Sequence, residues 1–187
     1  MSRTHRLTVA IVLLSQVGFL AGMIGFHEYR SHNWQKVRLQ TEPVDPVSLF
    51  RGRYVRLGYA FDTLETRDKA WMSGDEVLIR LVPGKDGIWR MKEFGRHLEA
   101  LTGSALLRGE VRYISQHNDK RGQPIRRLHI QTPIETYFLS ERQAPQVERL
   151  QRGRRAQITV DVALSYSGQA QLEQLYVEGI PAQDYRP

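Results

Sequence analysis

The sequence predicts a mainly β protein, with one N-terminal transmembrane helix followed by a single β-rich domain that contains one or two short helices. Two observations lead to this prediction. Over most of the chain, apolar and polar residues alternate with a period of two, the pattern of half-buried strands. A long uncharged stretch interrupts that pattern near the amino terminus. The β-rich domain is expected to be a sandwich or a partly closed barrel, because strand patterns do not decide closure.

The predicted membrane anchor is residues 7–26, LTVAIVLLSQVGFLAGMIGF, which carry no charged side chain. A helix of about 20 residues spans about 30 Å, the hydrocarbon thickness of a bilayer. We favour an uncleaved anchor over a cleaved secretory signal, because the apolar region is long and no small-residue cleavage site is evident. Basic residues flank both ends of the anchor, so their distribution does not decide its orientation. A large following domain can be exported regardless of its charge, so we expect residues 1–6 to stay in the cytoplasm and the domain to be exported.

Residues 27–41 form a polar juxtamembrane segment that contains Tyr29 and Trp34, residue types common at membrane interfaces. We expect this segment to extend the anchor helix into the headgroup region. Pro43 and Pro46 then stop helical continuation. The exported β-rich domain is therefore expected to occupy residues 42–187.

The expected strands follow in chain order. Residues 53–61 alternate strictly between the two faces of a strand. The turn PGKDG joins two β-rich runs, at 76–82 and 88–94, into a hairpin. Further strands are expected at 105–115, 125–131, 134–140, 156–166 and 171–180. The domain should therefore contain at least seven strands.

Two short segments have helical signals. In the segment 95–103, apolar residues at Phe94, Leu98 and Leu101 have helical spacing, and Gly103 would end the helix. In the segment 144–153, a proline lies in the first turn and a glycine lies at the end, the favoured order of these two residues. We predict one or two short helices from these signals.

The chain has 27 Lys and Arg against 20 Asp and Glu, a net charge of +7, and no cysteine. A basic protein favours anionic lipid headgroups, envelope polymers or acidic partners. The arginines are spread along the chain rather than gathered on one element, so we do not expect nucleic-acid binding. Without cysteines, the sequence carries no evidence about redox compartment.

No set of residues emerges from which a reaction could be written, so we expect a protein that is not an enzyme and has no cofactor or metal. The strongest catalytic alternative is a Ser-Lys dyad, because Lys69 and Ser73 would share one face of a helix. Their segment reads as a turn, however, with no oxyanion donor beside it. His27 and His32 lack a third metal ligand, and the HND sequence at 117–119 belongs to a turn.

The octet GRYVRLGY, residues 52–59, combines alternation with two glycines. In a strand, Leu57 and Tyr59 would pack inward with Val55, while the intervening residues would face outward. Packing alone is one interpretation of the octet. The other is a basic aromatic patch that meets an acidic partner, formed by Arg51, Arg53, Tyr54 and Arg56.

This octet resembles the signature of the GDYXXLXY family, membrane-anchored bacterial proteins named after the motif. Gly52, Tyr54, Leu57 and Tyr59 match the signature, and Arg53 stands where the family has aspartate, which reverses the charge there. The segments VDPVSLFRG, LLRGEVRY, IETYFLSE and LEQLYVEGIP resemble other parts of the family. The candidate partner-binding residues are accordingly Gly52, Arg53, Tyr54, Arg56, Leu57 and Tyr59.

The resemblance implies a single-pass protein of the bacterial inner membrane with a periplasmic C-terminal domain and no established enzyme activity. It also implies a polytopic membrane protein as partner. The expected function is an accessory or interaction module that works with such a partner. Two alternatives stay open, a binder of anionic lipids or envelope polymers and a Ser-Lys hydrolase.

Overall fold

The computed structural model describes residues 12–23, 25, 34–42, 54–118, 121–138 and 157–185. The chain divides into two compact units, Met1–Trp34 and Gln35–Pro187. In the first unit, residues 12–23 are helical. Within the described residues, no helix has both the length and the apolar character needed to cross a membrane. Residues 7–11, 24 and 26 of the expected anchor lie outside the described part of the chain.

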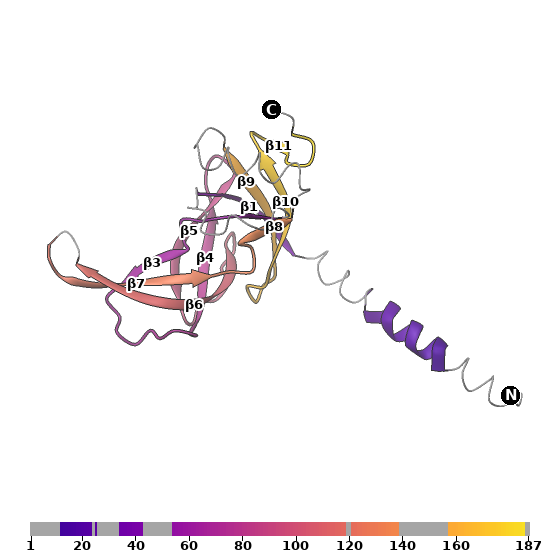
Figure 1. Ribbon diagram of the computed structural model, residues 1–187, viewed down its shortest axis with the longest axis horizontal. Coiled ribbons are helices and arrows are strands. Elements are labelled where there is room, and N and C mark those ends of the chain that lie inside the picture. Colours follow the sequence, from indigo (N-terminus) through magenta and orange to yellow (C-terminus); the bar gives the residue numbers. More distant parts are fainter. Residues whose placement is uncertain are drawn as a thin grey trace, which may run out of the picture. The chain divides into compact units, whose positions relative to one another are not determined.

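The second unit is mainly β, and its described residues form eleven strands (Figure 1). The hairpins expected at the turns 83–87 and 167–170 are confirmed, as is the pairing of the strands expected at 105–115 and 125–131. The strands are β1 (Gln35–Gln40), β2 (Tyr54–Arg56), β3 (Thr63–Thr66), β4 (Glu76–Pro83), β5 (Ile88–Gly95), β6 (Ala105–Asn118), β7 (Pro124–Gln131), β8 (Thr136–Phe138), β9 (Ile158–Leu164), β10 (Ala170–Val177) and β11 (Ile180–Pro181).

Nine strands form one mixed sheet in the order β11-β10-β9-β1-β5-β4-β6-β7-β3, and β2 and β8 form a separate two-stranded sheet. Strand β1 joins the two halves of the large sheet. It pairs antiparallel with β9 over six residue pairs and parallel with β5. Figure 1 shows β3, β6 and β7 curving away from the remaining strands of this sheet.

The large sheet curls around one hydrophobic core. Register shifts at bulges interrupt the β4–β5, β6–β7 and β9–β10 pairings, and bulges increase local bend and twist. The curl brings the β9–β10 turn onto β6, where the Arg108 N–H donates to the Gly168 carbonyl at 2.8 Å. One buried cluster therefore contains residues from five strands, Leu39, Leu81, Leu107, Leu128 and Leu175.

The prediction of a helix over residues 27–41 is wrong for residues 35–40, which form β1. Val37 and Leu39 are buried, while their neighbours are partly or fully exposed, so the burial has the period of a strand. Both pairing partners of β1 lie far along the chain, so no local turn indicated the strand. The compact β unit accordingly starts at Gln35, seven residues before the expected domain boundary.

The predicted helix over residues 95–103 is also wrong. Ser104 closes a turn there instead, since its N–H donates to the Leu101 carbonyl and its hydroxyl oxygen accepts from the Leu101 N–H. The carbonyl of Glu99 accepts from the buried Arg80 guanidinium at 2.7 Å, which diverts it from helical pairing. The second predicted helix, at residues 144–153, lies outside the described residues.

Leu39→Ala should lower the free energy of unfolding by about 2–5 kcal/mol, because the side chain is 2% exposed and its removal leaves a cavity in the core. Gln40→Ala, at the exposed neighbouring position, should change it by less than about 0.5 kcal/mol. Chemical denaturation of both variants measures the difference. Equal, mild effects would show that residues 35–40 do not form a central strand.

Candidate functional site

The motif octet lies partly in the small sheet formed by β2 and β8. Tyr54 lies opposite Phe138 and Arg56 lies opposite Thr136 in this antiparallel pair. Gly52 and Arg53, together with Arg51, lie outside the described residues, and only the backbone of Tyr54 is described. The strand is shorter than predicted. The chain turns at residues 59–62, where the Tyr59 N–H donates to Asp62 Oδ2 and the Asp62 N–H donates to the Tyr59 carbonyl.

One face of the small sheet points away from the core. Opposed residues in an antiparallel pair share a face, as do residues two apart on one strand, so Arg56, Thr136 and Phe138 lie together on it. Val55 and Tyr137 lie on the opposite face and pack into or against the core. The Arg56 side chain is 52% exposed, and Phe138 is 76% exposed. We call these three residues the motif face.

Leu57 and Tyr59 are buried beneath the motif face, as the alternation predicted. The Leu57 N–H donates to the Glu135 carbonyl at 2.8 Å, and the Tyr59 hydroxyl donates to the Ile134 carbonyl at 2.8 Å. Burial raises the pKa of the Tyr59 phenol well above its usual value, so the hydroxyl stays protonated and remains a donor. These two motif residues tie the segment after β2 to the segment before β8.

A carboxyl group that the sequence did not single out lies next to the buried tyrosine. Asp62 Oδ2 accepts from the Tyr59 N–H at 2.9 Å, while Asp62 Oδ1 is buried and has no hydrogen-bond partner among the described residues. Burial raises the pKa of Asp62 to about 7; nearby Glu135 and Glu42 also raise it, whereas Arg56 lowers it. Asp62 therefore changes protonation near neutral pH, directly under the motif face.

The Ser-Lys dyad, which the sequence offered only as an alternative, is not assembled. Residues 69–75 form turns and irregular structure rather than a helix, so the spacing of four does not place Lys69 and Ser73 on one face. The Ser73 hydroxyl donates to the Arg112 carbonyl at 2.6 Å instead. The backbone carbonyl of Lys69 accepts a hydrogen bond from the Arg126 guanidinium.

Two histidines lie in a polar network on the outer face of β3, β6 and β7. Ser115 Oγ lies 3.1 Å from His129 Nε2, and the Tyr113 ring stacks on the His129 ring at 4.0 Å. Burial, with a contribution from Arg127, lowers the pKa of His129, so this imidazole is neutral at pH 7. Sequence analysis missed this pairing because the residues come from different strands. Cross-strand register is the signal that would have found it.

His117 belongs to the same surface, since its Nε2 lies 3.2 Å from both Glu65 and Arg127. Glu65 also pairs with Arg127 at 2.9 Å. No group of three or more His, Asp or Glu side chains within the described residues could hold a metal ion. Asp119, His27 and His32 lie outside the described part of the chain.

The fold and the motif face define a mainly β domain that exposes a basic and aromatic strand face above a buried tyrosine. The chain belongs to the GDYXXLXY protein family, which matches residues 16–175. This match confirms the resemblance seen in the octet and extends from the N-terminal helix into β10. No curated protein matches the chain, and no solved structure matches its fold.

Tyr59→Phe should lower the free energy of unfolding by about 1–2 kcal/mol, because it leaves the buried Ile134 carbonyl without its donor. Arg56→Ala, on the exposed face of the same motif, should lower the free energy of unfolding by less than about 0.5 kcal/mol. Denaturation by urea compares the two. A larger loss for Arg56→Ala would reverse the assignment of buried and exposed motif positions.

Asp62→Asn should change the pH dependence of stability. Between pH 4 and 7 the folded protein holds a proton on Asp62 that the unfolded chain has lost, so wild-type stability falls as pH rises through this range and levels off above about pH 7. The variant should lack this fall. Compared with the Asp62→Asn variant, the wild type should lose about 1–3 kcal/mol of its free energy of unfolding between pH 4.5 and pH 8.

Thermal and urea unfolding at several pH values measure the effect. Asp75→Asn is the control, because Arg96 lowers the pKa of Asp75 and this partly exposed carboxylate stays ionised over the same range. Parallel pH profiles for wild type and Asp62→Asn would contradict the prediction.

Proposed function

We propose that this protein is a membrane-held accessory module that docks onto a polytopic membrane protein through its motif face. The observation that carries the proposal is the division of the motif into two sides. Its buried side, Leu57 and Tyr59, fixes the small sheet to the core, and its outer side exposes Arg56 next to Phe138. Arginine and aromatic side chains are enriched at the energetic centres of protein interfaces.

The motif face is pre-organised for docking. The hydrogen bonds of Leu57 and Tyr59 hold both strands from beneath, and a surface that is already ordered loses less conformational entropy on binding. A rigid strand pair therefore supports affinity better than a loop of the same composition.

The charge of the motif face favours an acidic partner. Arg56 Nη2 lies 3.7 Å from the Glu135 carboxylate, which is a long contact for an ion pair on a half-exposed side chain. A contact of this length contributes little to stability, and the mostly buried Glu135 carboxylate keeps another partner, because its Oε1 accepts from the Thr132 N–H at 2.8 Å. Arg56 can therefore turn to a carboxylate of a partner at small cost, where the geometry allows shorter, charge-assisted hydrogen bonds.

The membrane attachment is proposed from residues 7–26, which carry no charge and include the helix at residues 12–23. Within this proposal the segment stays uncleaved in a bacterial inner membrane, with the β domain in the periplasm. Attachment would keep the motif face close to a membrane partner and raise its effective concentration there.

The test is co-purification of the full-length protein from membranes in mild detergent. Arg56→Glu and Phe138→Ala should each abolish or strongly reduce recovery of a stoichiometric membrane protein, while leaving the thermal unfolding midpoint close to that of wild type. Arg112→Glu is the matched control, because it reverses the charge of an exposed arginine on β6, outside the motif face.

A second protein, with residues 7–26 replaced by an unrelated span, separates the two possible contact regions. Retention of the partner by this protein places recognition in the β domain. Loss of the partner only when the span is exchanged would overturn the motif face as the docking site. Recovery of anionic lipid or envelope polymer alone, with no stoichiometric protein, would favour that alternative.

A further inference from the structure

A groove of about 610 Å³ lies where the β9–β10 turn rests on β6, and no residue of the motif face lines it. Its lining comes from the start of β4, from β6, from the end of β7 and from the β9–β10 turn with the start of β10. Gly168 in this turn has a positive φ of 86°, and a Cβ atom there would lie 3.1 Å from the Arg108 backbone nitrogen. A glycine therefore lets the turn come close enough to β6 to form one wall.

Two glutamates face each other in this groove. Glu76 lies directly opposite Glu110 in the β4–β6 pair, and Glu110 lies opposite Gln131 in the β6–β7 pair. Opposed residues share a face of the sheet, so these exposed side chains form a row across three strands. Like charges that lie directly opposite each other are destabilising. A positive group beside the row therefore stabilises it.

Arg108 supplies that positive group for Glu76. Its Nη1 donates to Glu76 Oε2 at 2.9 Å, and its Nη2 donates to the Ser167 carbonyl at 2.9 Å. The groove thus already holds one guanidinium, between a carboxylate of β4 and a backbone oxygen of the β9–β10 turn. The planar fork of a guanidinium suits two acceptors that lie in different directions.

Glu110 is the carboxylate that this pairing leaves over. Among the described residues, its side chain has no hydrogen bond and no ion pair, and Arg112, the next basic residue along β6, lies outside the lining. With two glutamates against one arginine, the lining carries one net negative charge, although the whole chain has a net charge of +7. The exposed amides of Gln131 and Gln169 add hydrogen-bond acceptors from β7 and from the turn.

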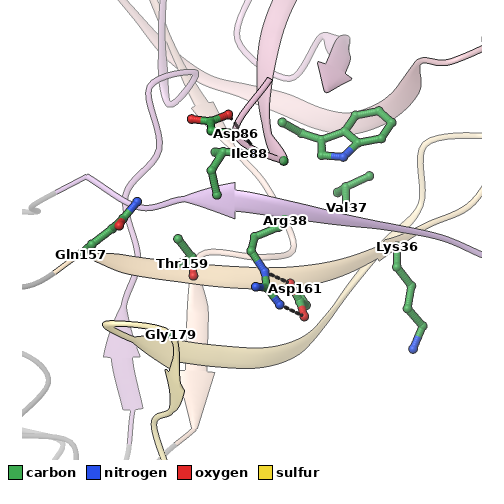
Figure 2. Close-up of a pocket in the computed structure, with 11 residues that line it drawn as sticks. Lys36, Val37, Arg38, Asp86, Ile88, Gln157, Thr159, Asp161 and Gly179 are labelled. Carbon is green, nitrogen blue, oxygen red and sulfur yellow. Dashed lines mark hydrogen bonds and ion pairs between the residues drawn. The ribbon is translucent and has the colours of Figure 1, made fainter. Parts of the chain in front are cut away.

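A second groove, over β1 and β9, differs in this respect (Figure 2). Figure 2 shows Arg38 on β1 pointing to Asp161 on β9, and the two are joined by bonds of 2.6 and 2.7 Å. Each charged side chain in its lining has a partner: Lys36 with Glu173, Arg38 with Asp161, and Asp86 with Arg90. A charged ligand would have to displace one of these partners, whereas Glu110 is available to a cation.

We propose that the groove at Glu110 binds an arginine side chain of a partner protein. The guanidinium repeats the arrangement of Arg108, donating to the Glu110 carboxylate and to the amide oxygen of Gln131 or Gln169. A free small cation fits less well, because a single exposed ion pair contributes little, whereas a protein partner adds surrounding contacts that exclude water. This inference does not rest on docking through the motif face, which favours an acidic partner.

The experiment titrates the full-length protein in mild detergent with a capped heptapeptide of glycine and serine that carries one central arginine. NMR follows the side-chain amide signals of Gln131 and Gln169, each assigned by its absence in Gln131→Ala or Gln169→Ala. We expect both signals to shift on saturable binding with a dissociation constant of about 1 mM or tighter. The same peptide with citrulline, which keeps the shape of the side chain but not its charge, should bind about tenfold more weakly or worse.

Two variants assign the site. Glu110→Gln keeps the shape of an exposed side chain but removes its charge, so it should weaken binding of the arginine peptide about tenfold or more. Glu99→Gln is the matched control, because it neutralises an exposed glutamate outside the groove and should bind the peptide as wild type does. Both variants should keep the unfolding midpoint of the wild type.

Several outcomes would overturn the proposal. One is the absence of any shift with the arginine peptide at about ten times the expected constant. Equal affinity for a lysine peptide would show that the groove reads charge alone, and equal affinity for guanidinium chloride would remove the need for a protein partner. Light scattering tests the remaining occupant: a wild-type dimer that Glu110→Gln dissociates would assign the groove to a second copy of this chain instead.

Discussion

The whole β unit depends on the two backbone ladders of β1. On one side, six residues pair with β9, and on the other side the same strand pairs in parallel with β5. Removal of β1 would separate the sheet into one group of β9–β11 and another of β3–β7. The hydrophobic core draws on both groups, because Leu107 of β6 and Leu175 of β10 belong to one buried cluster. The curl of the sheet and the contact of Gly168 with β6 both depend on this joint.

The motif has two sides that follow from one alternation. Leu57 and Tyr59 are buried and bond to the segment before β8, while Arg56 is presented outward on the adjacent strand pair. The buried half can therefore hold the segment in place while Arg56 stays exposed. The partly buried Asp62 adds a titratable group beside Tyr59, whose N–H donates to its carboxylate.

Elements with local signals could be predicted from the sequence. The hairpins β4–β5 and β9–β10 combine period-two alternation with Gly or Pro turns, and both formed where expected. The inward positions of the motif were predicted for the same reason. Strand β1 could not be recognised, because it is short, mostly polar and pairs with distant strands. The Arg38–Asp161 pair, 123 residues apart in sequence, and the proximity of Asp62 to Glu135 are products of tertiary structure.

The position of β1 also sets the order in which the domain can assemble. β1 is the first strand of the sheet to be synthesised, and its longest ladder is completed only by β9, near the end of the chain. Hairpins between β4 and β7 can form earlier from local contacts, but closing so long a loop is slow and leaves a strand edge unpaired in the meantime. An unpaired edge invites pairing with another chain. Lys36 and Arg38 place two positive charges on this strand, which disfavours its association with a second copy until β9 arrives.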